Sequence, residues 1–481
     1  MAANTASVAA PPAMKGRLRG LLSGAREIDD APVEVRGTLP AWLHGRLLLN
    51  GPALWDLPNG RYRHWFDGQA MFHRIRLGPG DARYRSRFQQ SEDYRATIAA
   101  GRPAIGGFGQ PDPETFLQRM RHFGKPRTTD NGAVVMGRIG EVWVAQTETP
   151  RLNRFDPETL ETLGPFAYED QEVINLASAH SITAADGTYW NVGVALGPKC
   201  VYKLFRIRPG SRRREVIAAW QVPASGYLHG FAMTPTHAVV WDPCLRVQPL
   251  KFLFTGNAYI DNFAWEPQAG GRIHAVSLAD GRVRSWTVPA FFAFHAIQAF
   301  DDGDALVLDL CTSQPAMVPA LELDRLRAGH PLDVPHEALR YRLQGEGGSA
   351  APQFIGRGFE LPMVHGAYWT RRRARWCWAT ALDPEGRAPL FDRTVKVDLE
   401  TGQWAASWQR EGAIHMEPLY VDRPGSTQEE DGVLLVPTLA DEDPGTVVGV
   451  VDPKTMGMLA TLHLPQVVPF GFHAAWDGQA S

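Results

Sequence analysis

The stretch FDPETLETLG, residues 155–164, places an aspartate, two further residues and a threonine between two short runs of strand-forming residues. The same order returns in VDLETGQWAASW (397–408) and VDPKTMGMLAT (451–461), and SLADGRVRSW (277–286) is a shorter variant. Aspartate and threonine side chains bond the backbone of a turn, and proline presets φ at its first corner. Each stretch therefore predicts a β-hairpin, and hairpins spread over the chain favour an all-β fold built as a β-propeller.

The hairpins recur too loosely to give a number of blades. A β-sandwich is the alternative, but the hairpins extend over most of the chain with no linker between modules. Helical periodicity is confined to two short segments, at 112–124 and 319–329. We expect residues 1–20 to form a flexible N-terminal tail and residues 21–481 to form a single propeller domain.

The composition is that of an ordinary globular protein. The net charge of −3, from 49 basic and 52 acidic residues, gives no reason to expect a nucleic-acid partner. No apolar run reaches the roughly 18 residues that a membrane-spanning helix needs. The four cysteines form no CxxC pair and are expected to be free thiols in a reducing compartment, which favours a cytoplasmic location.

Four histidines lie in short apolar runs that are typical of buried strands: LASAHSITA, GYLHGFAMT, FFAFHAIQAF and PFGFHAAWDG, which contain His180, His229, His295 and His473. Singly, each is more often a core residue than a ligand. Their wide spacing excludes a local finger or a helix-borne site, but it suits one ligand from each of several blades meeting on a propeller axis. Four neutral imidazoles would favour Fe, Zn, Cu or Ni.

Metal-bound histidines usually donate their other N–H to a carboxylate. Three glutamates stand in otherwise apolar strands and are candidates for this role: Glu148 in VAQTETP, Glu360 in GRGFELPMV and Glu417 in IHMEPLYV. Taken singly, each is also compatible with a surface glutamate, but the set of three beside four histidines strengthens the interpretation.

Several motifs in order resemble the carotenoid cleavage oxygenase family, from LLNGPALWDLPNGRYRHWFDGQAMFHRIRL (48–77) through TETPRLNRFDPETLETLG, SAHSITAADGTYWNVG, YLHGFAMTP, FAFHAIQAFDD and MEPLYVDRPGSTQEEDGVLL to PFGFHAAW. The resemblance implies a seven-bladed propeller capped by loops and short helices. It also implies one Fe(2+) per subunit on the axis, held by His180, His229, His295 and His473. In the family, three of these histidines are paired with glutamates, and His180 has no such partner. By motif, Glu148 would hold His229, Glu360 would hold His295 and Glu417 would hold His473.

The resemblance further implies that iron and O2 cleave one double bond of a lipophilic polyene to give two carbonyl products, with retinal-type aldehydes among them. Stilbene-cleaving relatives carry a tyrosine and a lysine where this sequence has Phe88 and Thr147, so these two residues are expected to contact an apolar substrate instead. Glu114 stands where the isomerohydrolase branch has a cysteine, which puts that activity and a lipid anchor in doubt. A stilbene dioxygenase and a non-enzymatic propeller scaffold are the alternatives.

A polyene substrate resides in membranes, so peripheral membrane contact is expected. Two apolar and basic segments are candidates, at 108–127 and 249–260, although each could equally be an ordinary cap segment. The first would present Phe108, Phe116, Leu117, Met120 and Phe123 beside Arg119, Arg121 and Lys125. His64 is interpreted as structural and not as a fifth ligand.

Overall fold

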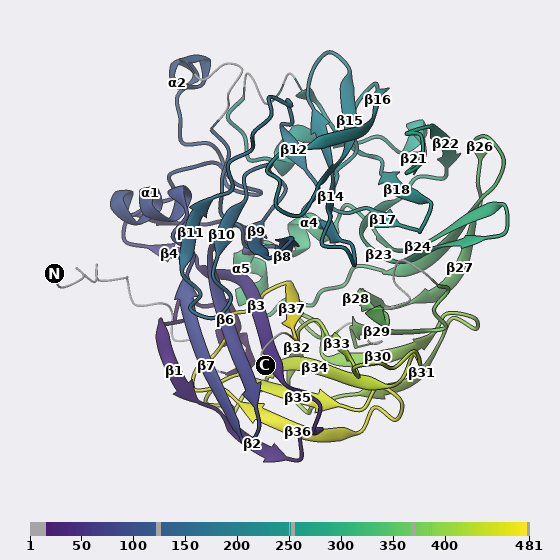
Figure 1. Cartoon of the computed structure of the whole chain (residues 1–481). Helices are drawn as coiled ribbons and strands as arrows, with labels where there is room; N and C mark the ends of the chain where they lie inside the picture. Colours follow the sequence, from purple (N-terminus) through teal and green to yellow (C-terminus); the bar gives the residue numbers. More distant parts are fainter. Residues whose placement is uncertain are drawn as a thin grey trace.

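The computed structural model describes residues 16–121, 127–249, 251, 255–366, 372–383, 385 and 387–478. Within these residues, seven sheets of four to six strands and two two-stranded ribbons account for the strands. Figure 1 shows the sheets arranged around a common centre. The expected all-β, seven-bladed propeller is confirmed.

The first blade joins the two ends of the chain. Its strand β37 (His473–Asp477) pairs with β3 (Gly45–Leu54), so the C-terminal strand closes the ring from the inside (Figure 1). The outer strands of this blade are β6 (Gln69–Gly78), β7 (Asp81–Phe88) and β1 (Ile28–Pro32).

The next three blades follow in chain order. The second contains β8 (Val135–Ile139), β9 (Val142–Gln146), β10 (Asn153–Phe155) and β11 (Thr162–Pro165). In the third, β12 (Leu176–Ala177) and β13 (Ile182–Thr183) both pair with β14 (Tyr189–Ala195), followed by β15 (Cys200–Ile207) and β16 (Glu215–Val222). The fourth contains β17 (Ala232–Met233), β18 (His237–Asp242), β21 (Gly271–Ser277), β22 (Val283–Val288) and β26 (Gly348–Ser349).

The last three blades complete the ring. The fifth contains β23 (Phe292–Asp302), β24 (Ala305–Ser313), β25 (Glu337–Leu343) and β27 (Pro352–Arg357). The sixth contains β28 (Phe359–Met363), β29 (Trp376–Ala381), β30 (Arg393–Asp398) and β31 (Gln403–Trp408). The seventh contains β32 (Ile414–His415), β33 (Leu419–Asp422), β34 (Gly432–Leu439), β35 (Val447–Val451), β36 (Met458–His463) and β2 (Glu34–Gly37).

The repeated aspartate turns form hairpins between the outer strands of the second, sixth and seventh blades. The Oδ1 atoms of Asp156, Asp398 and Asp452 each accept a hydrogen bond from the backbone N–H two residues ahead, at 2.8–2.9 Å. Four residues after each aspartate the backbone adopts a positive φ, at Leu160, Gly402 and Met456. The turn chemistry read from the sequence is therefore the chemistry that shapes these hairpins.

Short helices and two ribbons complete the described fold. The α-helices are α1 (Glu92–Ala100), α2 (Phe116–Arg121), α4 (Met317–Ala320) and α5 (Leu323–Arg327). The 3-10 helices are η1 (Gly16–Leu21), η2 (Trp65–Asp67), η3 (Ile260–Asn262) and η4 (Pro267–Ala269), and the ribbons pair β4 (Asp56–Leu57) with β5 (Gly60–Arg61) and β19 (Leu245–Val247) with β20 (Phe263–Trp265). No helix in the described part of the chain has the length and apolar character needed to cross a bilayer.

The division into a tail and one domain stays a prediction. Residues 1–15 of the expected tail lie outside the described residues, whereas the next six form η1, in which Leu21 is buried. All four cysteines are buried free thiols.

Candidate metal centre

The four histidines come from four blades and meet at the centre of the ring. His180 lies in the loop between β12 and β13, and His229 lies just before β17. His295 is within β23, and His473 is the first residue of β37. The pairing of β23 with β24 shifts register on both sides of Ala296, an irregularity of the kind that re-aims side chains next to functional sites.

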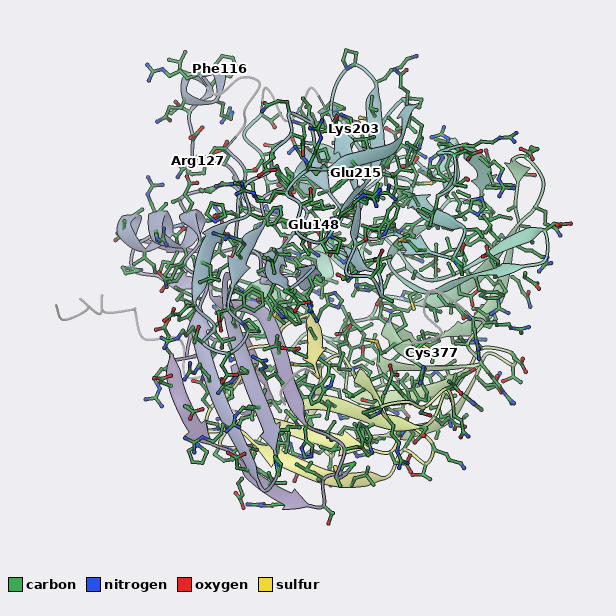
Figure 2. All side chains as sticks on the ribbon, viewed as in Figure 1. Phe116, Arg127, Glu148, Lys203, Glu215 and Cys377 are labelled. Atoms are coloured by element: carbon green, nitrogen blue, oxygen red, sulfur yellow. The ribbon has the colours of Figure 1, made fainter. Side chains whose placement is uncertain are left out.

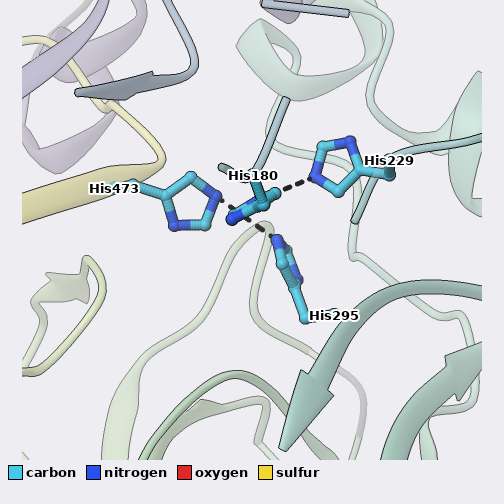
Figure 3. Close-up of side chains that lie close together, drawn as sticks. All are labelled: His180, His229, His295 and His473. Carbon is cyan, nitrogen blue, oxygen red and sulfur yellow. Dashed lines mark hydrogen bonds between the residues drawn. The ribbon is translucent and has the colours of Figure 1, made fainter. Parts of the chain in front are cut away.

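The imidazoles are close enough to share one ion. One ring nitrogen from each histidine lies within 4.8 Å of the others. The Nε2 atoms of His180 and His229 are 3.2 Å apart, and those of His295 and His473 are 3.3 Å apart (Figure 3). Two nitrogen ligands at about 2.1 Å from a metal are roughly 3.0–3.4 Å apart at angles between 90° and 109°. The donor set therefore fits a single transition-metal ion.

Three of the histidines are held by buried carboxylates. His229 Nδ1–H donates to Glu148 Oε1 at 3.0 Å. His295 Nδ1–H donates to Glu360 Oε2 at 2.7 Å, and His473 Nδ1–H donates to Glu417 Oε1 at 2.9 Å. Each bond fixes the tautomer that leaves Nε2 free to bind a metal. No carboxylate pairs with His180 among the described residues. Its main chain is instead tied to that of His229, because His180 N–H donates to the carbonyl oxygen of His229 at 3.3 Å and Ala179 N–H donates to the same oxygen at 3.0 Å.

Burial favours the neutral form, which a metal requires, in two of the four imidazoles. Burial, with the nearby His473, His229 and His295, holds the pKa of His180 well below its usual value. Burial also lowers the pKa of His229. For Glu148 and Glu360 burial acts to raise the carboxyl pKa, but the histidine partner of each, together with other neighbouring groups, lowers it overall. These shifts favour the neutral imidazole of His180 and His229 and the ionised form of Glu148 and Glu360, and a carboxylate offsets part of the charge of a divalent cation.

Tyr227 is a residue of the centre that the sequence reading missed. Its hydroxyl donates to Glu148 Oε1 at 2.7 Å, the same oxygen that accepts from His229. The tyrosine stands two residues before His229 in GYLHGF, a spacing that places both side chains on one side of an extended backbone. That spacing was the available signal.

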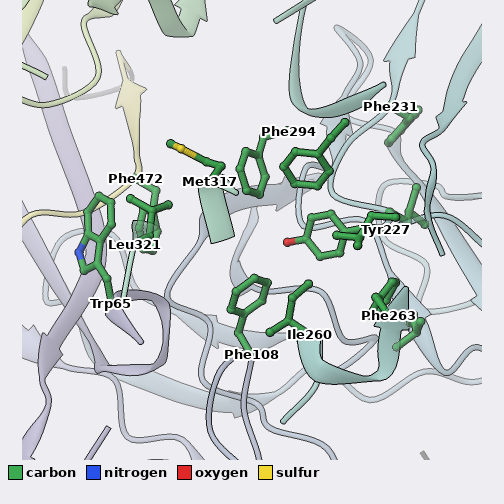
Figure 4. Packing of buried hydrophobic residues seen from close by; sticks show 14 of the residues in the cluster. Trp65, Phe108, Tyr227, Phe231, Ile260, Phe263, Phe294, Met317, Leu321 and Phe472 are labelled. Atoms are coloured by element: carbon green, nitrogen blue, oxygen red, sulfur yellow. The ribbon is translucent and has the colours of Figure 1, made fainter. Parts of the chain in front are cut away.

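A large apolar cavity reaches the histidines. It has a volume of about 970 Å³, and His229, His295 and His473 form part of its wall, as do Glu148 and Glu360. Apolar side chains form much of the rest of the wall, among them Trp65, Phe108, Phe294, Met317, Leu321 and Phe472, which belong to one buried hydrophobic cluster (Figure 4). A cavity with such walls accepts an extended apolar molecule and keeps bulk water away from the centre.

The two expected substrate contacts fall in different places. Thr147 is buried and lines the cavity, and its hydroxyl donates to Glu148 Oε2 at 3.3 Å. Phe88 lies at the end of β7, stacks on Tyr94 with ring centroids 5.4 Å apart, and is not among the described residues that line the cavity. This position gives no support to a substrate contact. The sequence motif fixes where Phe88 stands in the chain but not which way its side chain points.

His64 lies outside the cluster, as expected. Its Nδ1 accepts a hydrogen bond from Phe66 N–H, and its Nε2–H donates to the carbonyl oxygen of Val318 at 3.0 Å. Both ring nitrogens are thus used within the protein, which explains a structural role.

Fold and site together define the class of protein: a seven-bladed β-propeller whose centre gathers four histidines able to hold a metal ion. Residues 22–477 match the family described as RPE65, retinal pigment epithelial membrane protein. The chain is 33% identical to the chloroplastic carotenoid cleavage dioxygenase 8 homolog A of Oryza sativa subsp. japonica, over 93% of this chain and 85% of that protein. It is 29% identical to the human mitochondrial carotenoid-cleaving dioxygenase, over 96% and 92% of the two chains.

The chain therefore belongs to this family, whose members include carotenoid cleavage dioxygenases. The expectation of an enzyme, as opposed to a non-enzymatic scaffold, is confirmed. A solved structure of Synechocystis apocarotenoid oxygenase superposes with a TM-score of 0.83 at 23% identity, over 96% of this chain and 98% of that chain, and shows that the two share a fold.

Proposed function

We propose that this protein is a non-haem Fe(2+) dioxygenase that uses O2 to cleave one conjugated C=C bond of a carotenoid or apocarotenoid into two carbonyl products. The observation that carries the proposal is a cluster of four histidines, three of which line a mostly apolar cavity of about 970 Å³. The likeness to carotenoid-cleaving relatives supports it.

Ferrous iron, when bound, would supply the electron density that lets O2 react with a singlet polyene. His180, His229, His295 and His473 would hold it, and the donor set leaves coordination positions for small molecules. Glu148, Glu360 and Glu417 fix the orientation of three of the rings through the Nδ1–H bonds. The aromatic wall holds the polyene in place and excludes water, so the position of the chain in the cavity selects the bond that is cut.

An apolar polyene fits the cavity better than a phenolic stilbene. Thr147, next to Glu148, has a short side chain whose hydroxyl already donates to that carboxylate, so it is poorly placed to bind a phenol hydroxyl. Retinal-type aldehydes are among the products we propose to look for.

Peripheral membrane contact would let a lipophilic substrate enter directly. In α2, Phe116 is 46% exposed and Leu117 is 72% exposed, beside Arg119 and Arg121. Exposed apolar side chains next to basic ones suit the boundary between lipid headgroups and acyl chains. Phe108, which the sequence placed on the same docking face, is instead buried in the cavity wall because its loop folds inward.

Other parts of the expected membrane surface are not described. Phe123, Lys125, residues 250 and 252–254, and the side chain of Met120 lie outside the described residues. A cytoplasmic location remains a proposal, since the names of the relatives above place them in chloroplasts and mitochondria.

The test combines metal analysis with a substrate panel. Purified protein should contain about one iron per chain and should convert β-carotene or an apocarotenal to aldehydes with uptake of O2. His295→Ala should abolish both iron loading and turnover, whereas His330→Ala, on an exposed loop, should change neither. If resveratrol is the only compound cleaved, the substrate is a phenolic stilbene and not a polyene. A protein that contains no iron and takes up no O2 would refute the function.

A further inference from the structure

The cavity wall is not apolar throughout. One part of it, to which none of the four histidines contributes, contains Asp112, Glu114, Arg119, Arg127 and Asn257. Figure 2 shows Arg127 on the side of Phe116 and α2, away from Glu148. A hydrocarbon gains nothing from ionic groups in such a position, so this region requires a separate explanation.

Arg119 is fixed in place and retains unused donors. Its Nη1–H donates to the carbonyl oxygen of Glu114 at 2.5 Å. The guanidinium packs closely under Gly256, where an added Cβ would lie 2.4 Å from Nη1. Its Nε–H is buried and has no hydrogen-bond partner among the described residues. A guanidinium carries five N–H donors, and Arg119 uses one of them, on Nη1, in a hydrogen bond among the described residues, so the group can donate to a ligand oxygen from the cavity wall.

Arg127 adds a second cation at the same place. Its nearest carboxylate oxygens, in Glu92 and Glu114, are 3.9 and 4.0 Å away, which is beyond hydrogen-bond distance. Because Asp112 and Glu114 line the same part of the cavity, two negative groups face two positive ones. This balance disfavours a carboxylate ligand and suits a neutral oxygen that accepts from arginine.

We propose that Arg119 and Arg127 form a polar subsite that binds the carbonyl or hydroxyl oxygen at one end of a linear polyene. The inference rests on the proposed function and narrows its substrate class to apocarotenoids with an oxygenated terminus. A guanidinium that holds one end of a rigid conjugated chain sets which double bond reaches the histidines. The two arginines are therefore positioning residues that determine the scissile bond.

The test compares two ligands of equal conjugated length, an apocarotenal and the corresponding hydrocarbon. Binding to the iron-loaded protein is followed under argon by quenching of tryptophan fluorescence, since Trp65 lines the cavity. Arg119→Met should raise the Kd of the aldehyde about tenfold or more, the usual value of a hydrogen bond to a charged group, and change that of the hydrocarbon less than twofold. Arg95→Met is the control, because Arg95 is an exposed residue of α1 and is not among the described lining residues.

Loss of affinity for both ligands in equal measure, no change for either, or the same effect in Arg95→Met would overturn the subsite. If Arg119→Met fails to fold by circular dichroism, Arg127→Met carries the same comparison. Binding is measured without oxygen, so selectivity for the aldehyde can be established even if cleavage is never observed. Conversely, a wild type that cleaves polyenes without this selectivity would refute the subsite and leave the proposed function intact.

Discussion

Replacement of Glu360 by glutamine keeps the size of the side chain and removes its charge. Oε2 of Glu360 accepts hydrogen bonds from His295 Nδ1–H, at 2.7 Å, and from Leu361 N–H. The amide oxygen of glutamine must take this position, because the amide nitrogen there would face two donors. The amide nitrogen then occupies the position of Oε1, which is buried and has no partner among the described residues.

Two costs follow from this geometry. Two amide N–H groups without acceptors destabilise the folded state by about 1–3 kcal/mol. The neutral amide also makes the imidazole of His295 a weaker ligand, and loss of such an outer partner typically lowers metal affinity 10- to 100-fold. At 25 °C this corresponds to about 1.4–2.7 kcal/mol of binding free energy.

The assay is competition for ferrous iron under argon against a chelator of known affinity, with circular dichroism to confirm the fold. Glu337→Gln is the matched control, since Glu337 is an exposed residue of β25. Glu360→Gln should weaken iron binding by at least tenfold, while the control should match the wild type. An unchanged iron affinity in a folded Glu360→Gln protein would refute the assignment of this carboxylate to the metal centre.

Three further predictions concern the surroundings of the site. Tyr227→Phe removes the hydroxyl that donates to Glu148 Oε1. It should weaken iron binding less than tenfold and lower the unfolding free energy by about 1 kcal/mol. A loss of iron affinity as large as that of Glu360→Gln would contradict the expectation that Tyr227 matters less than Glu360. Burial lowers the pKa of His415 to about 3, so its unfolded form, with a pKa near 6.5, takes up a proton first on acidification and stability falls below about pH 6.5. Urea titrations should therefore show that, between about pH 7.5 and 5, the unfolding free energy of the wild type falls by roughly 2 kcal/mol more than that of His415→Gln. If the unfolding free energies of the two proteins fall equally with pH, His415 does not cause the loss of stability. Phe116→Ser combined with Leu117→Ser should weaken binding to lipid vesicles about tenfold or more in sedimentation assays, whereas the control Leu163→Ser with Val173→Ser, which changes exposed residues away from α2, should not.

The fold was predictable as far as local chemistry determines it. The aspartate turns at 156, 398 and 452 were readable because each hairpin is built from residues adjacent in sequence. The number of blades was not, because inner strands such as β12, β13 and β32 have only two residues each and give no periodic pattern. The family resemblance supplied the blade count that the residues alone left open.

The site was predictable in its residue types but not in its full extent. Histidines and glutamates are unusual in apolar strands, so their positions stand out in the sequence. The polar group at Arg119 and Arg127 gives no such signal, because charged residues in a short helix and in the segment after it are ordinary until folding brings them to one cavity wall. The substrate contact expected at Phe88 stays a prediction, since Phe88 is not among the described residues that line the cavity.

Closure of the ring and assembly of the metal centre depend on the same carboxylate. His473 begins β37, the strand that joins the end of the chain to β3, where it stands opposite Asn50. Glu417 of the seventh blade accepts from His473 Nδ1–H through Oε1 and from Ala474 N–H through Oε2, at 2.9 Å each. One side chain thus orients a histidine and secures the first residues of the closing strand to the neighbouring blade. The fourth imidazole can reach the centre only when the ring is closed, which couples the geometry of the metal centre to the integrity of the whole propeller.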